Sequence, residues 1–265
     1  MTKFIAIGRR RFQELSEGDL NRYFAVLSKR GVLPRWFSLI GNFRFYLDFL
    51  FQGVDFVNKR MIDIGAGTGV YSFYAAIKGA REVISLEPEL AGATSSALST
   101  FSAISVDLGL TQVRLQRQML QAYASDGECF DIILLNNSIN HLDESACMNL
   151  LRDPVAVERY RALFRKLSSI ANVGGTLIVT DCMDSNFFAR LRLRNPFAPT
   201  IEWQKHQHPK TWAHLLAEAG FANPDVQWTP PTKLGTLGKA LLGNETAAFF
   251  LTSHFRLAMD KPRIT

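Results

Sequence analysis

Residues 61–70, with the sequence MIDIGAGTGV, carry the pattern in this chain that points most directly to ligand binding. Gly65, Gly67 and Gly69 stand at alternate positions, and glycine lets the backbone turn tightly and approach a ligand closely because it has no Cβ. The residues before the turn suit a buried strand, and those after it suit a helix whose free N–H groups point at the turn. Asp63, just before the turn, suits a cationic ligand group better than a phosphate. The stretch therefore predicts a nucleotide-binding turn.

The glycine spacing separates classes of nucleotide. A dinucleotide-binding turn has the pattern G-x-G-x-x-G, but here Val70 holds the last position of that pattern, because the third glycine comes one residue early. No lysine follows as in a P-loop. Glu87, followed by Pro88, ends the next apolar run, and an acidic residue at the end of a second strand can accept both hydroxyls of a ribose. The spacing thus argues against a nicotinamide-dependent oxidoreductase.

Four elements in order carry a family resemblance: residues 63–69 (DIGAGTG), Glu87, residues 130–135 (FDIILL) and residues 174–179 (GGTLIV). In this order and spacing they resemble the class I S-adenosylmethionine (SAM) dependent methyltransferases. The resemblance covers about residues 57–257, and each element has the structural context that its motif requires. The alternative is that the glycine stretch is a turn in some other α/β protein.

The resemblance implies SAM as the cofactor and S-adenosylhomocysteine as the product. It implies that one group of residues lines the cofactor, from the methionine part and the sulfur to the ribose and the adenine: Asp63, Gly65, Ala66, Gly67, Gly69, Glu87, Pro88, Met119, Leu120 and Asn136. Family members often carry an acid after strand three that accepts from the adenine amino group. Residues 117–120 (RQML) have no acid, so Gln118 or backbone groups are left for that contact.

His141 is the predicted general base. It follows the fourth predicted strand, where similar small-molecule methyltransferases often have paired histidines, although the first of the pair is Asn140 here. Histidine suits proton transfer near neutral pH, but it could instead only hydrogen-bond the following helix. His206 and His208 are alternatives. They could also bind a metal, but no third ligand is obvious nearby, and we predict no metal site.

The acceptor is predicted to contact Asn140, Arg190, Arg194, His206 and His208. Arginines suit phosphate and carboxylate groups, so residues 190–194 could clamp an anion, although a solvated surface would look the same. Residues 205–212 and 252–255 resemble bacterial methyltransferases of surface-polysaccharide gene clusters. We predict methyl transfer to an oxygen of a small or medium-sized acceptor, and that resemblance implies a saccharide or a lipid-linked saccharide.

These residues need a sheet to position them. Seven short apolar runs predict strands at residues 61–64, 83–86, 112–116, 130–135, 176–180, 224–228 and 247–257, with a loop at 229–244. We therefore expect an α/β fold with a doubly wound, Rossmann-like, seven-stranded and mainly parallel sheet. Open sheets of this kind bind ligands at the carboxyl ends of their strands.

The predicted organisation is a helical N-terminal extension, residues 1–57, and a SAM-binding domain, residues 58–265, with a cap at 183–210. The extension is expected to pack on the core, to cover the active site as a lid, or to touch a membrane surface. Its aromatic part, residues 36–57, is long enough to span a bilayer, but it contains Arg44, Asp48 and Asp55, and charges inside a span are costly. No transmembrane helix is therefore predicted.

Composition sets the remaining expectations. The 265 residues are 47% hydrophobic, enough for a globular core, and the net charge of +6 favours anionic partners without establishing nucleic-acid binding. The three cysteines lie far apart, which fits a reducing cytoplasm, and no secretory signal is apparent. Two rival functions stay open: an RNA methyltransferase that uses Arg9–Arg11, and a non-catalytic SAM-binding protein. The oligomeric state is not predicted.

Overall fold

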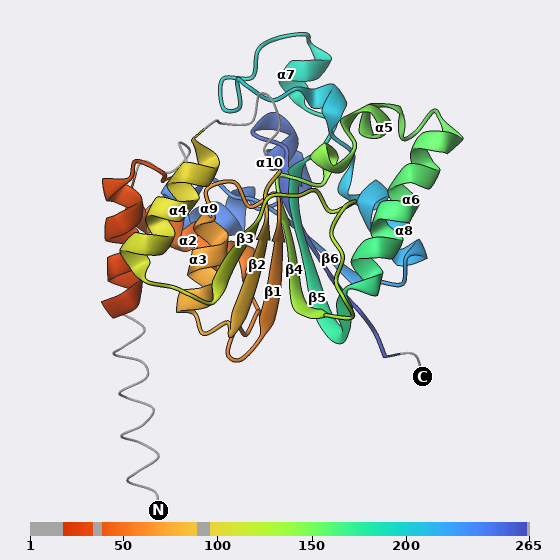
Figure 1. Cartoon of the computed structure of the whole chain (residues 1–265). Coiled ribbons are helices and arrows are strands. Elements are labelled where there is room, and N and C mark those ends of the chain that lie inside the picture. Colours follow the sequence, from red (N-terminus) through yellow and green to blue (C-terminus); the bar gives the residue numbers. More distant parts are fainter. Residues whose placement is uncertain (1–17, 34–38, 89–95, 264–265) are drawn as a thin grey trace, which may run out of the picture.

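The computed structural model describes residues 18–33, 39–88 and 96–263. A seven-stranded sheet forms the middle layer, and helices cover both of its faces (Figure 1). The strand order is β3-β2-β1-β4-β5-β7-β6, and only β7 runs antiparallel to its neighbours. The strands are β1 Arg60–Ile64, β2 Glu82–Leu86, β3 Val113–Gln116, β4 Phe130–Asn136, β5 Ala171–Cys182, β6 Ala222–Trp228 and β7 His254–Asp260. The predicted doubly wound, mainly parallel fold is confirmed.

The central strands are apolar because both of their faces are buried. On one face the core includes Trp212 and Tyr160, whose ring centroids lie 5.1 Å apart. These side chains come from α6 (Pro154–Ser169) and α8 (Pro209–Glu218), and α5 (Glu144–Asn149) joins the same layer. α6 starts at Asp153, whose carboxylate accepts from the Val155 N–H while Pro154 occupies the first turn.

The other face is covered by α3 (Val70–Ile77), α4 (Ala97–Leu108), α2 (Ile40–Leu50) and a helix over residues 18–29. The last two belong to the predicted N-terminal extension. Tyr23 anchors the first of them to α3, because its hydroxyl donates to the Val70 carbonyl over 2.8 Å. Arg256 of β7 donates to the Leu50 carbonyl over 2.7 Å and so anchors α2 to the far strand. Arg9–Arg11 lie outside the described residues.

Two segments differ from the sequence expectation. Residues 229–244 are not a simple loop, because they contain a short 3-10 helix and α9 (Gly235–Leu242). The predicted strand over 247–257 is wrong in its first half, which forms α10 (Glu245–Phe250), and the strand begins only at His254. The physical reason is local: Asn244 caps α10 by accepting from the Ala247 N–H over 2.9 Å. A short apolar run does not by itself distinguish strand from helix.

No helix among the described residues is both long and apolar enough to span a bilayer. α7 (Phe187–Arg190) lies in the segment between β5 and α8, beyond the carboxyl ends of the parallel strands (Figure 1). α10 lies beside it, and the Phe187 and Phe250 ring centroids are 5.0 Å apart. The segment predicted as a cap therefore stands over the edge of the sheet at which such folds bind ligands.

Candidate functional site

The glycine turn after β1 is tightly built. Gly65, Gly67 and Gly69 all have positive φ, a region that side-chain-bearing residues rarely adopt. The N–H groups of Gly65 and Ala66 both donate to the Leu86 carbonyl, over 2.8 and 3.0 Å, which fixes the turn against the end of β2. A Cβ on Gly65 would lie 2.6 Å from the Cβ of Ser138, so the turn also packs against the segment that follows β4.

Gly67 and Gly69 are glycines for different reasons. A Cβ on Gly69 would lie 2.5 Å from the Phe101 ring and 2.8 Å from Phe73, so this glycine is needed for packing. A Cβ on Gly67 would meet no atom within 4 Å among the described residues. The space over Gly67 is therefore open to a ligand.

This difference predicts opposite phenotypes for a matched pair of variants. Gly69→Ala is expected to lower the free energy of unfolding by about 3 kcal/mol, because it adds overpacking to backbone strain. Gly67→Ala is expected to cost about 1 kcal/mol of strain and to lose mainly cofactor affinity. Urea unfolding and titration with S-adenosylhomocysteine measure the two quantities. Equal losses of stability in the two variants would contradict this assignment.

Asp63 is fully buried beside the turn. Its Oδ2 accepts from the Ser72 hydroxyl over 2.6 Å, and Ser85 in turn donates to Ser72 over 2.7 Å. Its Oδ1 has no hydrogen-bond partner among the described residues. Burial raises the pKa of Asp63 to about 7, and the nearby charge of Glu87 adds to the rise, while the Ser72 hydrogen bond opposes it. An orphaned oxygen on a destabilised carboxylate fits a cationic group of a ligand.

Glu87 stands at the end of β2 against the same turn. Its Oε2 accepts from the Gly67 N–H over 2.7 Å, so the carboxylate and the open space over Gly67 are adjacent. Pro88 follows as the last described residue before the gap at 89–95. After β3, Met119 is exposed and Leu120 is buried. The orphaned acid, the open glycine and this carboxylate fit the cofactor that the sequence resemblance implies, and the individual contacts stay predictions.

Asn136, the last residue of β4, gathers hydrogen-bonding side chains from several elements. Its Oδ1 accepts from the Thr180 hydroxyl over 2.9 Å and from the Tyr46 hydroxyl over 3.3 Å. Tyr71 of α3 also hydrogen-bonds Asn136 and lies close enough to Asp63 for their charges to interact. Side chains of α2, α3, β4 and β5 thus meet at one place.

Buried Asp181, at the carboxyl end of β5, pairs with the partly buried His206. His206 Nδ1 lies 2.8 Å from Asp181 Oδ1, which also accepts from the Cys182 N–H over 2.8 Å. Asp181 is 1% exposed, and its Oδ2 has no partner among the described residues. Burial raises the pKa of Asp181, and the His206 hydrogen bond opposes the rise. When Nδ1 donates to this carboxylate, Nε2 carries the lone pair and can accept a proton.

His254, at the start of β7, extends this group, although its position in the sequence did not mark it as a site residue. His254 Nε2 lies 2.8 Å from Asn137 Oδ1, and Nδ1 lies 2.8 Å from the Thr229 hydroxyl. Burial and the nearby His206 lower the pKa of His254 to about 4, so its imidazole is neutral near pH 7. With both nitrogens engaged, His254 serves to position Asn137 rather than to move a proton.

His141 lies in a more open setting. Its side chain is 53% exposed, and its Nδ1 lies 2.6 Å from Glu144 Oε1. Hydrogen bonds from Lys205 and from His141 lower the pKa of Glu144. Asn140 is buried, and its Oδ1 has no partner among the described residues. His141 is also close enough to Asp181 for their charges to interact.

The other residues predicted to contact the acceptor have different local roles. His208 caps α8, because its Nδ1 accepts from the Lys210 N–H over 3.2 Å. Arg190 and Arg194 are exposed, and the Arg190 guanidinium lies 5.1 Å from the centroid of the Phe249 ring. Within the described ranges, no three His, Cys, Asp or Glu side chains gather closely enough to hold a metal ion.

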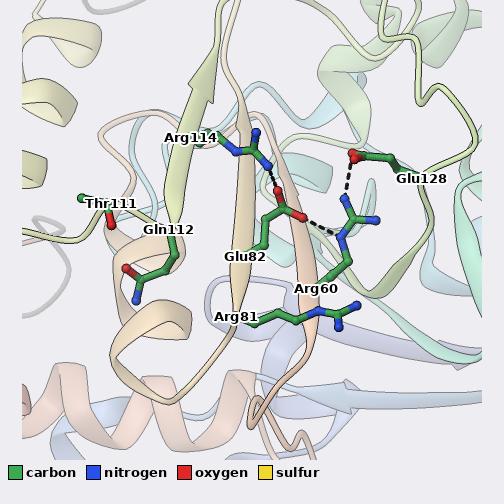
Figure 2. A pocket seen from close by; sticks show the side chains of 7 residues that line it. All are labelled: Arg60, Arg81, Glu82, Thr111, Gln112, Arg114 and Glu128. Carbon is green, nitrogen blue, oxygen red and sulfur yellow. Dashed lines mark hydrogen bonds and ion pairs between the residues drawn. The ribbon is translucent and has the colours of Figure 1, made fainter.

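A hollow also lies at the opposite edge of the sheet, at the amino ends of β1, β2 and β3. Figure 2 shows its lining, in which Glu82 lies between Arg60 and Arg114 and pairs with both. Arg60 pairs with Glu128 over 2.7 Å as well. Parallel α/β sheets bind ligands at the other edge, so this hollow is not part of the candidate site.

Comparisons with known proteins agree with this arrangement. A family model described as a methyltransferase domain matches residues 40–226, more than half of the chain. A protein of Listeria monocytogenes assigned as a SAM-dependent methyltransferase superposes with a TM-score of 0.56 at 12% identity, covering 84% of this chain and 99% of its own. A SAM-dependent methyltransferase from Mesorhizobium loti gives 0.53 at 16% identity, covering 78% and 93%. The [4+2]-cyclase SpnF gives 0.53 at 13% identity, covering 83% and 81%. No curated protein matches the chain.

Proposed function

The chain belongs to the class I SAM-dependent methyltransferases, and from this premise we propose that it methylates an oxygen of a small or medium-sized acceptor, such as a saccharide or an anionic metabolite. The Asp181–His206 pair is the observation that carries the proposal. A hydroxyl is a weak nucleophile unless a base removes its proton, and a histidine oriented by a buried carboxylate is suited to that task. The basic cap residues Arg190 and Arg194 favour an acceptor that carries negative charge.

The reaction divides between the two halves of the site. Bound SAM supplies an electrophilic methyl group on a sulfonium, which leaves as the neutral thioether of S-adenosylhomocysteine. Nε2 of His206 would accept the proton of the acceptor hydroxyl, so that the oxygen could form its bond to the transferred methyl group. Asp181 holds the imidazole in the required tautomer and stabilises its cation. Asn140 and His141 are proposed to orient the acceptor, with His141 as the alternative base.

The cofactor half is proposed to act mainly by positioning. Asp63 would hold the amino group of SAM, the open space over Gly67 would admit the ligand against the turn, and Glu87 would accept from the ribose hydroxyls. Since the sulfonium is already a good leaving group, alignment of the two reactants supplies much of the acceleration.

Glu87→Ala is expected to weaken binding of S-adenosylhomocysteine by about tenfold to a hundredfold, the usual worth of hydrogen bonds to a charged group. A 2′-deoxy analogue provides the control. The native protein should bind this analogue more weakly than S-adenosylhomocysteine. The Glu87→Ala variant should bind the two ligands with equal affinity, because the affinity lost with the carboxylate and the affinity lost with the hydroxyl then do not add. Additive losses in calorimetric titration would show that Glu87 does not contact the ribose.

The proposed activity is tested directly with labelled SAM. The purified protein is incubated with a panel of hydroxylated saccharides, anionic metabolites and RNA, and mass spectrometry seeks an acceptor that gains one methyl group. A methyl ether from the first two classes supports the proposal, and methylated RNA would replace it. Because the cyclase SpnF has a similar fold, binding of S-adenosylhomocysteine without turnover of any acceptor class would indicate a function other than methyl transfer.

A further inference from the structure

Residues 190–194, with the sequence RLRLR, form an unusual surface in the cap. All five side chains are exposed, and Leu191 and Leu193 are 54% and 56% exposed. Phe197 and Phe250 add half-exposed rings, at 50% and 47%. Single exposed apolar side chains are ordinary, but several large ones gathered in one structure point to a contact surface. We refer to residues 190–197 together with Phe250 as the cap ridge.

The base of the cap ridge is firmly held, so its exposure is not that of a loose tail. Asn186 precedes the ridge and Asn195 lies within it, and both are buried. The Asn195 amide donates to the Leu251 carbonyl over 2.6 Å and to Asn186 Oδ1 over 3.2 Å, and its own Oδ1 accepts from the Phe197 N–H over 2.8 Å. Asn186 donates to the Phe249 and Leu251 carbonyls. Two buried asparagines thus fix a segment whose apolar side chains project into solvent.

Aromatic packing supports the same segment from below. The Phe187 ring lies 5.0 Å from Phe250 and the Phe188 ring lies 6.3 Å from Phe197, measured between centroids. Leu191 and Leu193 remain exposed although these rings pack together beside them in the chain. This arrangement presents apolar side chains outward from a stable platform.

The charges select the partner. Arg190, Arg192 and Arg194 alternate with the two leucines, and none of the three has an ion-pair partner among the described residues. The nearby Glu202 pairs with Lys205 over 2.8 Å. A contact with the ridge of a second copy would bring the arginines of the two copies together, and their charges repel. A nucleic acid would pair with the arginines but would offer no apolar contact to the leucines. Anionic lipid headgroups over an acyl layer satisfy both kinds of side chain.

We infer that the cap ridge docks the protein on the surface of a bilayer that contains anionic lipid. The ridge stands beyond the carboxyl ends of the strands, beside α7 and α10 (Figure 1), so docking brings the candidate site toward the membrane. The acceptor class that this placement favours is a membrane-attached one, such as a lipid-linked saccharide. That extension depends on the proposed function, whereas docking itself does not.

Sedimentation with lipid vesicles tests the inference. The full chain is expected to pellet with vesicles of phosphatidylcholine and phosphatidylglycerol much more than with phosphatidylcholine alone. Leu191→Ser with Leu193→Ser should lower the partition coefficient by at least about tenfold. Arg190→Gln, Arg192→Gln and Arg194→Gln together should lower it by about a hundredfold on anionic vesicles, at about fivefold for each charge.

The matched control is Val57→Ser with Val106→Ser. These two valines lie at the opposite end of the sheet and are 65% and 80% exposed, so they are more exposed than the two leucines. This control variant should partition like the native protein. Binding of S-adenosylhomocysteine and thermal unfolding report whether each variant is folded, and they keep a failure of docking distinct from a failure of the cofactor site. Leu193→Trp gives a second measurement, because its fluorescence should be quenched by brominated lipid beyond the quenching of the native tryptophans.

Four outcomes would overturn the inference. The native protein fails to pellet with anionic vesicles; the leucine and control variants lose partitioning equally; the leucine change converts a dimer to a monomer without affecting vesicles; or the arginines bind RNA whether or not the leucines are present. The third outcome would assign the ridge to self-association, and the fourth would assign it to polyanion binding.

Discussion

Asp63→Asn is expected to weaken binding of S-adenosylhomocysteine by about a hundredfold or more at neutral pH, the largest loss expected from any single change in the cofactor half. The reason is the burial of Asp63 and its orphaned Oδ1, which leave a ligand cation as the partner that this carboxylate lacks. Truncating one member of a buried charge pair usually costs about 2–5 kcal/mol. Calorimetric titration measures the loss, and Asp48→Asn, which changes an exposed acid on α2, is the control that should bind normally.

The same change is expected to stabilise the protein without ligand at high pH. The pKa of Asp63 is raised to about 7 in the fold, whereas an unfolded aspartate titrates near its ordinary value of 3.8. The folded state therefore holds the proton more tightly, and stability is full below the unfolded pKa and falls as pH rises toward the folded pKa. The fall amounts to about 4 kcal/mol, at about 1.4 kcal/mol for each unit of pKa. Asp63→Asn removes this pH dependence. In urea unfolding, the free energy of unfolding of the variant should therefore rise relative to that of the native protein between about pH 4 and about pH 7.

Proton release provides an independent check on the role of Asp63. Below about pH 7, a cationic ligand must displace the Asp63 proton, so affinity should rise with pH by up to about tenfold for each unit and then level off. Titrations in two buffers of different ionisation enthalpy count the protons released. A native protein that binds with no release near about pH 6, or an Asp63→Asn variant that still releases one, would separate Asp63 from the ligand cation.

Local patterns made the sheet and the glycine turn predictable from the sequence. The parallel strands are continuous apolar runs because helices bury both faces, and the three glycines mark positions of positive φ. The sequence did not show that the Phe101 ring leaves no space for a side chain at Gly69, because Phe101 belongs to α4, a later helix of the chain. The prediction of a strand over residues 247–257 was also wrong where α10 forms, because Asn244 caps the N-terminus of that helix.

Pairings made by tertiary folding could not be predicted in the same way. His206 lies within the cap segment, 25 residues after Asp181, and nothing in this spacing indicates a 2.8 Å contact. His254 reaches Asn137 only because the last strand runs antiparallel beside β5. The available signal was an acid at the carboxyl end of a predicted strand together with two histidines before α8. That signal could have placed Asp181 near the site, but it could not have chosen its partner.

His206→Gln is expected to lower kcat by about a hundredfold to ten-thousandfold, the usual range for a general base, while binding of S-adenosylhomocysteine stays unchanged. Asp181→Asn should lower kcat as well and should shift the acidic limb of the pH–rate profile, because the carboxylate positions the imidazole and stabilises its cation. His214→Gln, which changes a 75% exposed histidine on α8, is the matched control and should have no effect.

The decisive comparison is between His206 and His141, which was the base expected from the sequence. His141 is 53% exposed and pairs with an exposed glutamate, so solvent and Glu144 compete for its proton, whereas His206 is held by a carboxylate that has almost no contact with water. His141→Gln is therefore expected to raise KM more than it lowers kcat. NMR spectra of the histidine rings add a readout that needs no acceptor, since Asp181→Asn removes the Nδ1 contact of His206 and should change the ring signals of His206 more than those of His141. Full turnover in His206→Gln, together with loss of turnover in His141→Gln, would make His141 the base and would leave the Asp181–His206 pair a purely structural contact between β5 and the cap.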